Sequence, residues 1–169
     1  MPESGILVNG ECVAAFEQLS TGRKHRYIIY KISDDQKEVV IDDIGERNSA
    51  RESELGWEGL WEEFAQKLKT AKFTWSTGAT SELGPRFAVF DVPFTVPGEG
   101  DREKIVLISW SPDDASGPLA SRGKMAYSLA KPALAKALGS SVAFDIQIND
   151  EADLNWAGVR HVASKGKAV

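Results

Sequence analysis

Hydrophobic residues recur at helical spacing in four stretches of this chain, and the clearest is residues 56–68. Large apolar side chains there stand at positions i, i+3, i+4, i+7 and i+11: Trp57, Leu60, Trp61, Phe64 and Leu68. Only a helix, with 3.6 residues per turn, brings these positions to one face. The other expected helices cover residues 10–19, residues 122–138 with a kink at Pro132, and the stretch between Asn155 and Gly166.

Runs of β-branched and aromatic residues predict strands, because such side chains suit a pleated, half-buried surface. Five such runs occur, at residues 26–32, 38–41, 86–91, 105–110 and 142–147. The polar turn at residues 33–36 predicts a hairpin between the first two. Two prolines and two glycines between positions 93 and 100 predict a bent, exposed connection between the third and the fourth. The fourth is almost entirely apolar, so we expect it to be central and buried on both faces.

These elements predict an α/β protein of the α+β type, with a central mixed sheet of five or six strands and helices on both faces. The chain has 169 residues, 42% hydrophobic and 27% charged, which suits one folded domain over residues 1–169. We expect a flexible tail at residues 1–5. No apolar run reaches the ~18 residues of a membrane span, and the lone Cys12 excludes an intrachain disulfide. Without a secretory signal at its start, the protein is expected to be cytosolic.

The charge of the chain is unevenly distributed. The net charge is −5, which argues against a protein that coats nucleic acid. Residues 1–115 carry 13 basic and 21 acidic side chains, whereas residues 116–169 carry 7 basic and 4 acidic ones. A locally positive C-terminal third predicts a partner whose contact surface is acidic.

Patterns that carry enzymatic chemistry are weak in this sequence. His25 and His161 fit no metal-binding spacing, and the serines lack the Gly-x-Ser-x-Gly pattern of a nucleophile. We therefore expect that the protein is not an enzyme and binds no cofactor and no metal. The alternative is an enzyme whose active site these patterns do not reveal. The most distinctive pattern lies in helix 122–138, where Lys124, Ser128 and Lys131 project from one side just after Arg122. On charge pattern alone, a solvated helix face is the commoner explanation.

Several segments together resemble the actin-depolymerising factor and cofilin family, whose members share the ADF-homology domain. The strongest match runs from Arg102 to Asp113 and continues from Arg122 to Tyr127. Further matches lie at residues 4–13, 26–32 and 86–91, so that the resemblance covers the chain from Ser4 to Gly166. It implies a mixed sheet flanked by about four helices, and a non-enzymatic protein that binds actin monomers and filaments.

The resemblance also implies two binding surfaces. The main one, for actin monomers, combines the N-terminal tail with the long helix, and its residues here are Ser4, Gly5, Arg122, Lys124, Met125, Ser128 and Lys131. The second, specific to filaments, uses Arg102 and Lys104 with charged residues of the last helix, here Arg160, His161 and Lys165. The family commonly has a glutamate and two arginines in that helix, and Pro132 replaces an acidic residue. We therefore expect the protein to bind actin monomers. For filaments two functions remain as alternatives: severing, or binding to filaments or to a branch-point complex without severing.

Three further expectations concern regulation, partners and an insertion. A phosphate on Ser4 would place negative charge against an acidic partner and release it, the alternative being an ordinary tail serine. The cationic face is expected to attract phosphoinositide headgroups. We expect a monomer that acts in the cytoplasm at the cytoskeleton, and the sequence leaves nuclear entry undecided.

Residues 47–85 exceed the usual family connection by about ten residues, and Trp75 there is expected to pack over helix 56–68 or, alternatively, to anchor another partner.

Overall fold

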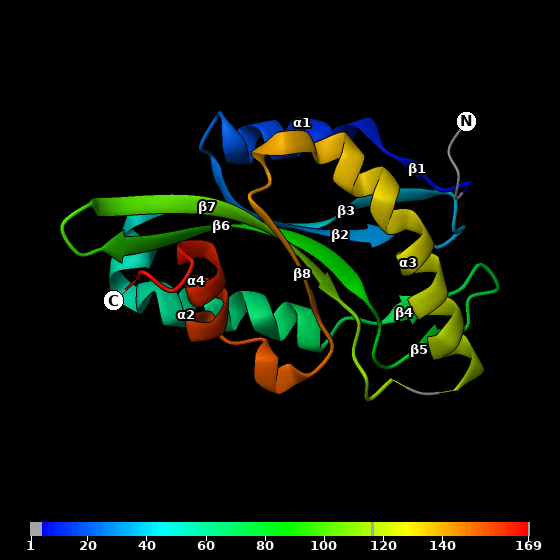
Figure 1. Cartoon of the computed structure of the whole chain (residues 1–169). Coiled ribbons are helices and arrows are strands. Elements are labelled where there is room, and N and C mark those ends of the chain that lie inside the picture. The colour runs from blue at the N-terminus through cyan, green and yellow to red at the C-terminus, as the bar shows by residue number, and fades with distance from the viewer. Residues whose placement is uncertain (1–4, 116, 169) are drawn as a thin grey trace.

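The computed structural model describes residues 5–115 and 117–168, and its helices and strands form one mixed sheet with helices on both sides (Figure 1). In this part of the chain the α-helices are α1 (Gly10–Ser20), α2 (Ser49–Lys69), α3 (Pro118–Leu138) and α4 (Trp156–Ser164). The strands of the main sheet are β1 (Leu7–Val8), β2 (His25–Ile32), β3 (Glu38–Glu46), β6 (Arg86–Val96), β7 (Gly100–Trp110) and β8 (Phe144–Ile148). Short 3-10 turns at Gly139–Ser141 and Glu151–Asp153 flank β8.

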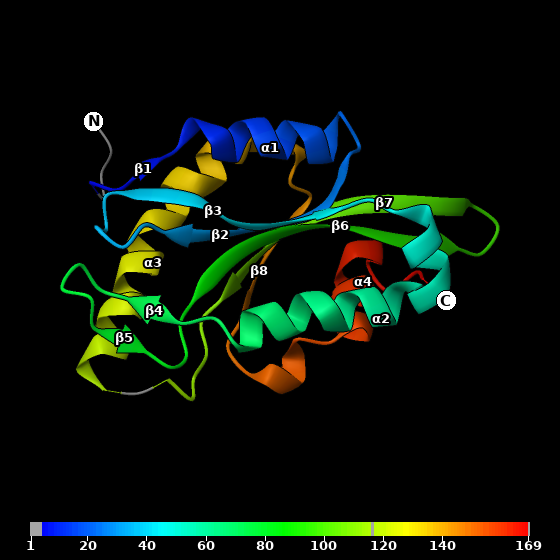
Figure 2. The same ribbon diagram turned by 180° about the vertical axis from the view of Figure 1, so that it is seen from behind.

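The strand order is β1-β3-β2-β6-β7-β8, with parallel pairs at both edges and antiparallel pairs between them. Helices α1 and α3 cover one face of this sheet, and α2 and α4 cover the other (Figures 1 and 2). Alternate residues of each strand therefore feed two separate cores, as Ile28 and Ile29 of β2 do. The α+β fold class, the sheet of five to six strands and the helices on both faces are confirmed.

The core between the sheet and helices α2 and α4 is built around Trp61. Its ring centroid lies 4.9 Å from that of Phe64, 5.1 Å from that of Phe90 and 5.8 Å from that of Trp156. The indole N–H of Trp61 donates a hydrogen bond of 3.2 Å to the carbonyl of Leu154. The stripe predicted from the spacing of apolar residues thus faces this core, although Trp57 and Leu60 are only half buried.

The predicted connection between residues 91 and 105 is exposed at residues 97–102, but it is much shorter than expected. Strands β6 and β7 continue as a long hairpin whose turn holds only residues 97–99. Pro93 fits into β6 because β6 pairs with β2 only as far as Phe90. The N–H that proline lacks is therefore not needed for a backbone hydrogen bond to β2. The central position of β7, with Val106, Leu107 and Ile108 buried, is confirmed.

Both long helices begin earlier than the apolar pattern predicts. Helix α2 starts at Ser49 after the cap Asn48, and Gly56, at a φ of 70°, interrupts it where the apolar stripe begins. Helix α3 starts at Pro118, a residue whose fixed φ and missing N–H suit the first turn. It runs through Pro132 to Leu138 and ends at Gly139, which has a φ of 79°.

Residues 73–81 form a hairpin of their own. Strands β4 (Phe73–Thr74) and β5 (Thr80–Ser81) pair in an antiparallel ribbon that lies beside the first half of α3 (Figure 2). Trp75 packs against Phe73 and Arg122, on the α3 side of the sheet, so the expectation that it covers helix 56–68 is wrong. Sequence spacing could not reveal this, because the contact joins segments almost 50 residues apart.

Candidate functional site

The outward face of α3 carries large apolar side chains that face solvent. Met125 is 66% exposed and Leu129 is 54% exposed, and Arg122 stands on the same face one turn earlier. Positions i, i+3 and i+7 of a helix point to the same side, so these residues form one strip, here called the α3 ridge. Exposed apolar side chains in a row typically mark a surface that another molecule covers. Sequence reasoning found Arg122 and Met125 but missed Leu129, which the spacing of four from Met125 could have revealed.

The N-terminal segment lies next to α3. Ile6 is buried in the core that α1 and α3 share, and strand β1 packs against α3. Leu7 of β1 is 55% exposed, which adds a further apolar side chain at this end of the molecule. Gly5 has a φ of 73°, a conformation that glycine adopts without strain, and it is exposed. The predicted site residue Ser4 lies outside the described residues.

Two lysines of α3, Lys124 and Lys131, face a different direction from the ridge. Lys124, Ser128 and Lys131 line a cavity of about 180 Å³ between α3 and the ends of β6, β7 and β8, here called the α3 groove. The Nζ of Lys124 donates to the carbonyl of Ala115 at 3.1 Å, and the Nζ of Lys131 pairs with Asp145 at 2.7 Å. The prediction that these three residues share one side of the helix is confirmed, but they lie apart from Arg122 and Met125 and two of them have partners within the chain.

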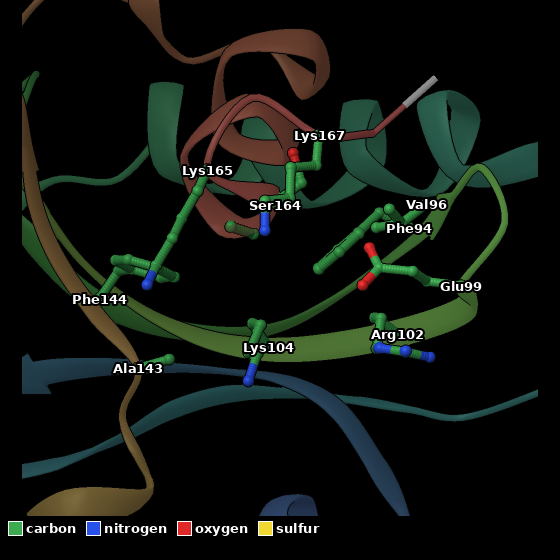
Figure 3. A pocket seen from close by; sticks show the side chains of 11 residues that line it. Phe94, Val96, Glu99, Arg102, Lys104, Ala143, Phe144, Ser164, Lys165 and Lys167 are labelled. Atoms are coloured by element: carbon green, nitrogen blue, oxygen red, sulfur yellow. The ribbon is translucent and has the colours of Figure 1, made fainter.

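The predicted filament-contacting residues gather at another end of the molecule. Arg102 and Lys104 of β7, Lys165 at the end of α4 and the missed Lys167 line a cavity of about 370 Å³, here called the basic cleft (Figure 3). Glu99 is the one acidic side chain among its described lining residues. Lys165 caps α4 in a left-handed conformation, with a φ of 55°, and Gly166 follows at 79°, so the chain turns back and brings Lys167 to the cleft.

Arg160 of the predicted filament set lies in a neighbouring cavity of about 500 Å³, which Arg102 also lines. The exposed His161 adjoins the glycine turn that ends α4, where a Cβ at Gly166 would approach its ring to 3.1 Å. The structure therefore brings Arg102, Lys104 and Lys165 together and places Arg160 beside them.

A cluster of charged side chains fixes the strand that carries Arg102 and Lys104. Successive side chains of a strand point to opposite faces, so Glu103 points away from both. It accepts hydrogen bonds from Arg23 at 2.6 Å, from Arg47 at 2.9 Å and from Arg26 at 3.2 Å. Arg47 also pairs with the buried Asp91.

The two carboxyl groups of this cluster respond differently to their surroundings. Burial raises the pKa of Asp91 to about 6, with a further rise from the neighbouring Glu103 that Arg47 only partly offsets. Burial also disfavours ionisation of Glu103, but hydrogen bonds from Asp91, Arg47 and Arg23 outweigh it and lower the pKa of Glu103 to about 2.

Stability is therefore expected to fall as the pH rises from about 4 to about 6. In this window the folded chain keeps the Asp91 proton that the unfolded chain, with a pKa of 3.8, has released, so the folded state binds more protons. Glu103, whose pKa is about 2 in the folded chain against 4.5 in the unfolded one, still gains stabilisation at the lower end of this window and offsets part of the fall there. Asp91→Asn removes the titration and should flatten the decline, by on the order of 1–2 kcal/mol across the window. Urea unfolding of both proteins at several pH values checks this, and parallel curves would contradict it.

The described residues bear on three possibilities, namely a metal site, a reactive thiol and a membrane-spanning helix. They contain no group of three or more His, Cys, Asp or Glu that could hold a metal ion. The thiol of Cys12 is fully buried, and burial raises its pKa to about 11, which leaves it a poor nucleophile. Within residues 5–115 and 117–168, no helix has the length and apolar character to cross a bilayer.

Comparisons with known proteins agree with one another. A family model described as cofilin/tropomyosin-type actin-binding protein matches residues 5–164. The chain is 37% identical over 170 residues to a cofilin from Gibberella zeae, with 100% of both chains covered. It is 32% identical over 162 residues to actophorin from Acanthamoeba castellanii, which covers 96% of this chain and 97% of the relative. The crystal structure of Streptomyces griseoflavus cofilin superposes with a TM-score of 0.72 at 26% identity, covering 96% of this chain and 99% of the other.

Proposed function

Because this chain belongs to the family of cofilin/tropomyosin-type actin-binding proteins, we propose that it binds actin monomers and filaments and promotes filament disassembly by severing and depolymerisation. The family is a non-enzymatic one, and the role proposed here is recognition of a protein surface. The observation that carries the proposal is the α3 ridge, where Met125 and Leu129 are more than half exposed beside Arg122.

The α3 ridge supplies the two kinds of contact that a protein interface needs. Burial of Met125 and Leu129 against actin would provide affinity, since a few buried anchors carry most of the binding energy of an interface. Arg122 would provide orientation toward an acidic surface. Gly5 and Leu7 extend the same surface from the N-terminal segment, because β1 packs against α3.

The basic cleft is proposed to contact a second actin subunit in the filament. In both views the β6–β7 hairpin and the first half of α3 lie at opposite ends of the molecule, so one copy could touch two neighbouring subunits (Figures 1 and 2). Arg102, Lys104 and Lys165 would meet acidic side chains there, and Arg160 lies beside them. Binding that favours a twisted filament shifts the filament toward that form by its differential affinity. Severing would follow at boundaries between decorated and bare segments.

Filament binding without severing, or binding to a branch-point complex, is the alternative. It is favoured by the last helix, where Arg160, His161 and Lys165 stand in place of the glutamate and two arginines that are common in the family. The altered charges change which contacts the basic cleft can make and so the strain that binding imposes on a filament.

Fluorescence microscopy of single filaments, combined with pelleting, separates the two functions. Severing predicts new filament ends and faster loss of polymer as the protein is added. Decorated filaments that pellet with the protein at a constant number of ends would support the alternative. A protein that neither pellets with filaments nor binds monomers would contradict both.

Phosphorylation of Ser4 is proposed to switch binding off. A phosphate adds about −1.5 to −2 charges, and Ser4 directly precedes Gly5, which together with Leu7 extends the surface that we assign to an acidic partner. Ser4→Glu, which adds a negative charge, is expected to weaken monomer binding about tenfold, whereas Ser4→Ala, which adds none, should bind like the wild type. Titration of fluorescent monomeric actin with each variant measures this, and equal affinity of the two variants would refute the switch.

The remaining proposals concern partners and place of action. The basic cleft and the cations of α3 are suited to phosphoinositide headgroups, which carry several negative charges. We further propose that the protein acts as a monomer in the cytoplasm at the cytoskeleton, and that it enters the nucleus with actin. Sedimentation, binding to phosphoinositide vesicles and imaging of the labelled protein test these three points separately.

A further inference from the structure

The β4–β5 hairpin is docked firmly on α3. The ring centroid of Phe73 lies 6.5 Å from that of Tyr127, and a Cβ added at Gly123 would lie only 3.0 Å from the Phe73 ring. The position of Gly123 in α3 therefore allows the hairpin to approach the helix closely. On its other side the hairpin is tied to the β2–β3 turn, because Gln36 Nε2 donates to the carbonyl of Thr74 at 3.0 Å.

Trp75 occupies a defined position at the end of this hairpin. Its backbone N–H donates to the carbonyl of Ala79 at 2.8 Å, and its carbonyl accepts from Gly78 at 2.8 Å, which closes the turn. Its ring centroid lies 5.9 Å from that of Phe73, so the ring packs against the docked part of the hairpin. The side chain remains only half buried.

Arg122 lies over the ring of Trp75. The Cζ atom of Arg122 is 5.4 Å from the ring centroid, within the range of a cation–π contact. Arg122 is exposed, and no ion pair joins it to another described residue. A guanidinium held over an aromatic ring can still donate two parallel hydrogen bonds to a carboxylate from its remaining N–H groups.

We propose that Trp75 is a positioning residue of the α3 ridge, which holds Arg122 ready for a carboxylate on the surface of actin. The proposal rests on the proposed function. An unsupported arginine samples many rotamers and loses this freedom on binding, whereas a stacked one has lost part of it beforehand. The hairpin within residues 47–85 thus acts through Arg122 and becomes part of actin recognition.

A double-mutant cycle on the full chain tests this, with affinity for monomeric actin as the readout. Arg122→Ala should weaken binding about tenfold, and Trp75→Leu, which keeps apolar bulk on Phe73 but removes the aromatic face, about threefold to tenfold. The double variant should bind no more weakly than Arg122→Ala alone. Trp75→Phe restores an aromatic face and should bind almost like the wild type.

Trp57→Ala is the matched control, because Trp57 also stacks on an arginine, Arg26, at 4.8 Å, but does so on the opposite face of the sheet. It should leave the affinity for monomeric actin unchanged. Thermal melts of all variants show whether a loss of affinity reflects unfolding. If Trp75→Leu melts early, Trp75→Phe takes its place in the cycle. In the Arg122→Ala background, Trp75→Phe should bind no more weakly than Arg122→Ala alone, and a further loss would overturn the positioning role.

The outcomes separate this inference from the proposed function. Additive losses from the Trp75 and Arg122 variants would mean that Trp75 contacts actin by itself and would overturn the positioning role. Equal affinity of Trp75→Leu and the wild type, with Arg122→Ala still weak, would overturn it while leaving the α3 ridge in place. Full affinity of Arg122→Ala would overturn both the positioning role and the use of Arg122, and failure of the wild type to bind would overturn the proposed function itself.

Discussion

Replacing both Met125 and Leu129 with alanine is expected to lower the affinity for monomeric actin by on the order of 100-fold. Truncation of a central interface anchor commonly costs ~1–2 kcal/mol or more, and every 1.4 kcal/mol is about tenfold in affinity. The two side chains are 66% and 54% exposed in the free protein, so their removal takes little from the core. The melting temperature should therefore stay within a degree or two of the wild-type value, roughly the range of neutral surface changes.

Leu55→Ala is the control for this pair of changes. Leu55 is also an exposed apolar side chain, at 36%, but it lies in α2 on the opposite face of the sheet from α3. Its variant should bind monomeric actin like the wild type. Unchanged affinity of the Met125 and Leu129 double variant would mean that the α3 ridge is not the contact surface. Early melting of that variant would mean that the two side chains serve the fold.

Trp61→Ala is expected to lower the free energy of unfolding by about 3–5 kcal/mol, the largest effect on stability that we predict. Trp61 is fully buried, and its ring contacts Phe64, Phe90 and Trp156, which joins α2 to the sheet and to α4. The change leaves a cavity among these rings and an unpaired carbonyl at Leu154. It also loosens the support of α4, which contributes Lys165 to the basic cleft.

Urea unfolding followed by far-UV circular dichroism measures the loss without depending on tryptophan fluorescence. Trp61→Phe is the informative companion, because it keeps an aromatic ring at the centre of the cluster and gives up only the indole N–H and part of the volume. Its loss should be clearly smaller than that of Trp61→Ala. A loss below about 1 kcal/mol for Trp61→Ala would show that the core tolerates the cavity and that the packing described here is not what stabilises α2.

Local patterns in the sequence predict the elements that bury one regular face. The apolar stripe of α2 is observed, and the side chains of Asn9 and Asn155 cap α1 and α4 where local sequence places them. Each depends on residues within one or two turns, so neighbouring positions contain the information. The same reasoning fails for the β6–β7 hairpin. Whether β6 can contain Pro93 depends on where β2 stops pairing with β6, and β2 lies far away in the sequence.

The binding surfaces follow the same division between local and distant information. Helical spacing predicts that Lys124 and Lys131 share a side, but not that Ala115 and Asp145 engage their amines. Both partners come from outside the helix, at distances in sequence that no periodicity reports. The expected position of Trp75 is wrong for the same reason, since its neighbour Arg122 belongs to an element almost 50 residues later.

Methyl NMR of the protein with labelled methionines tests the central claim, that the α3 ridge meets the actin monomer, most directly. The chain contains two methionines, Met1 and Met125, so the methyl spectrum should contain two assignable signals. Addition of unlabelled monomeric actin should shift or broaden the Met125 signal in step with the formation of the complex. Full complex formation with an unchanged Met125 signal would place the contact elsewhere on the molecule and would contradict the account.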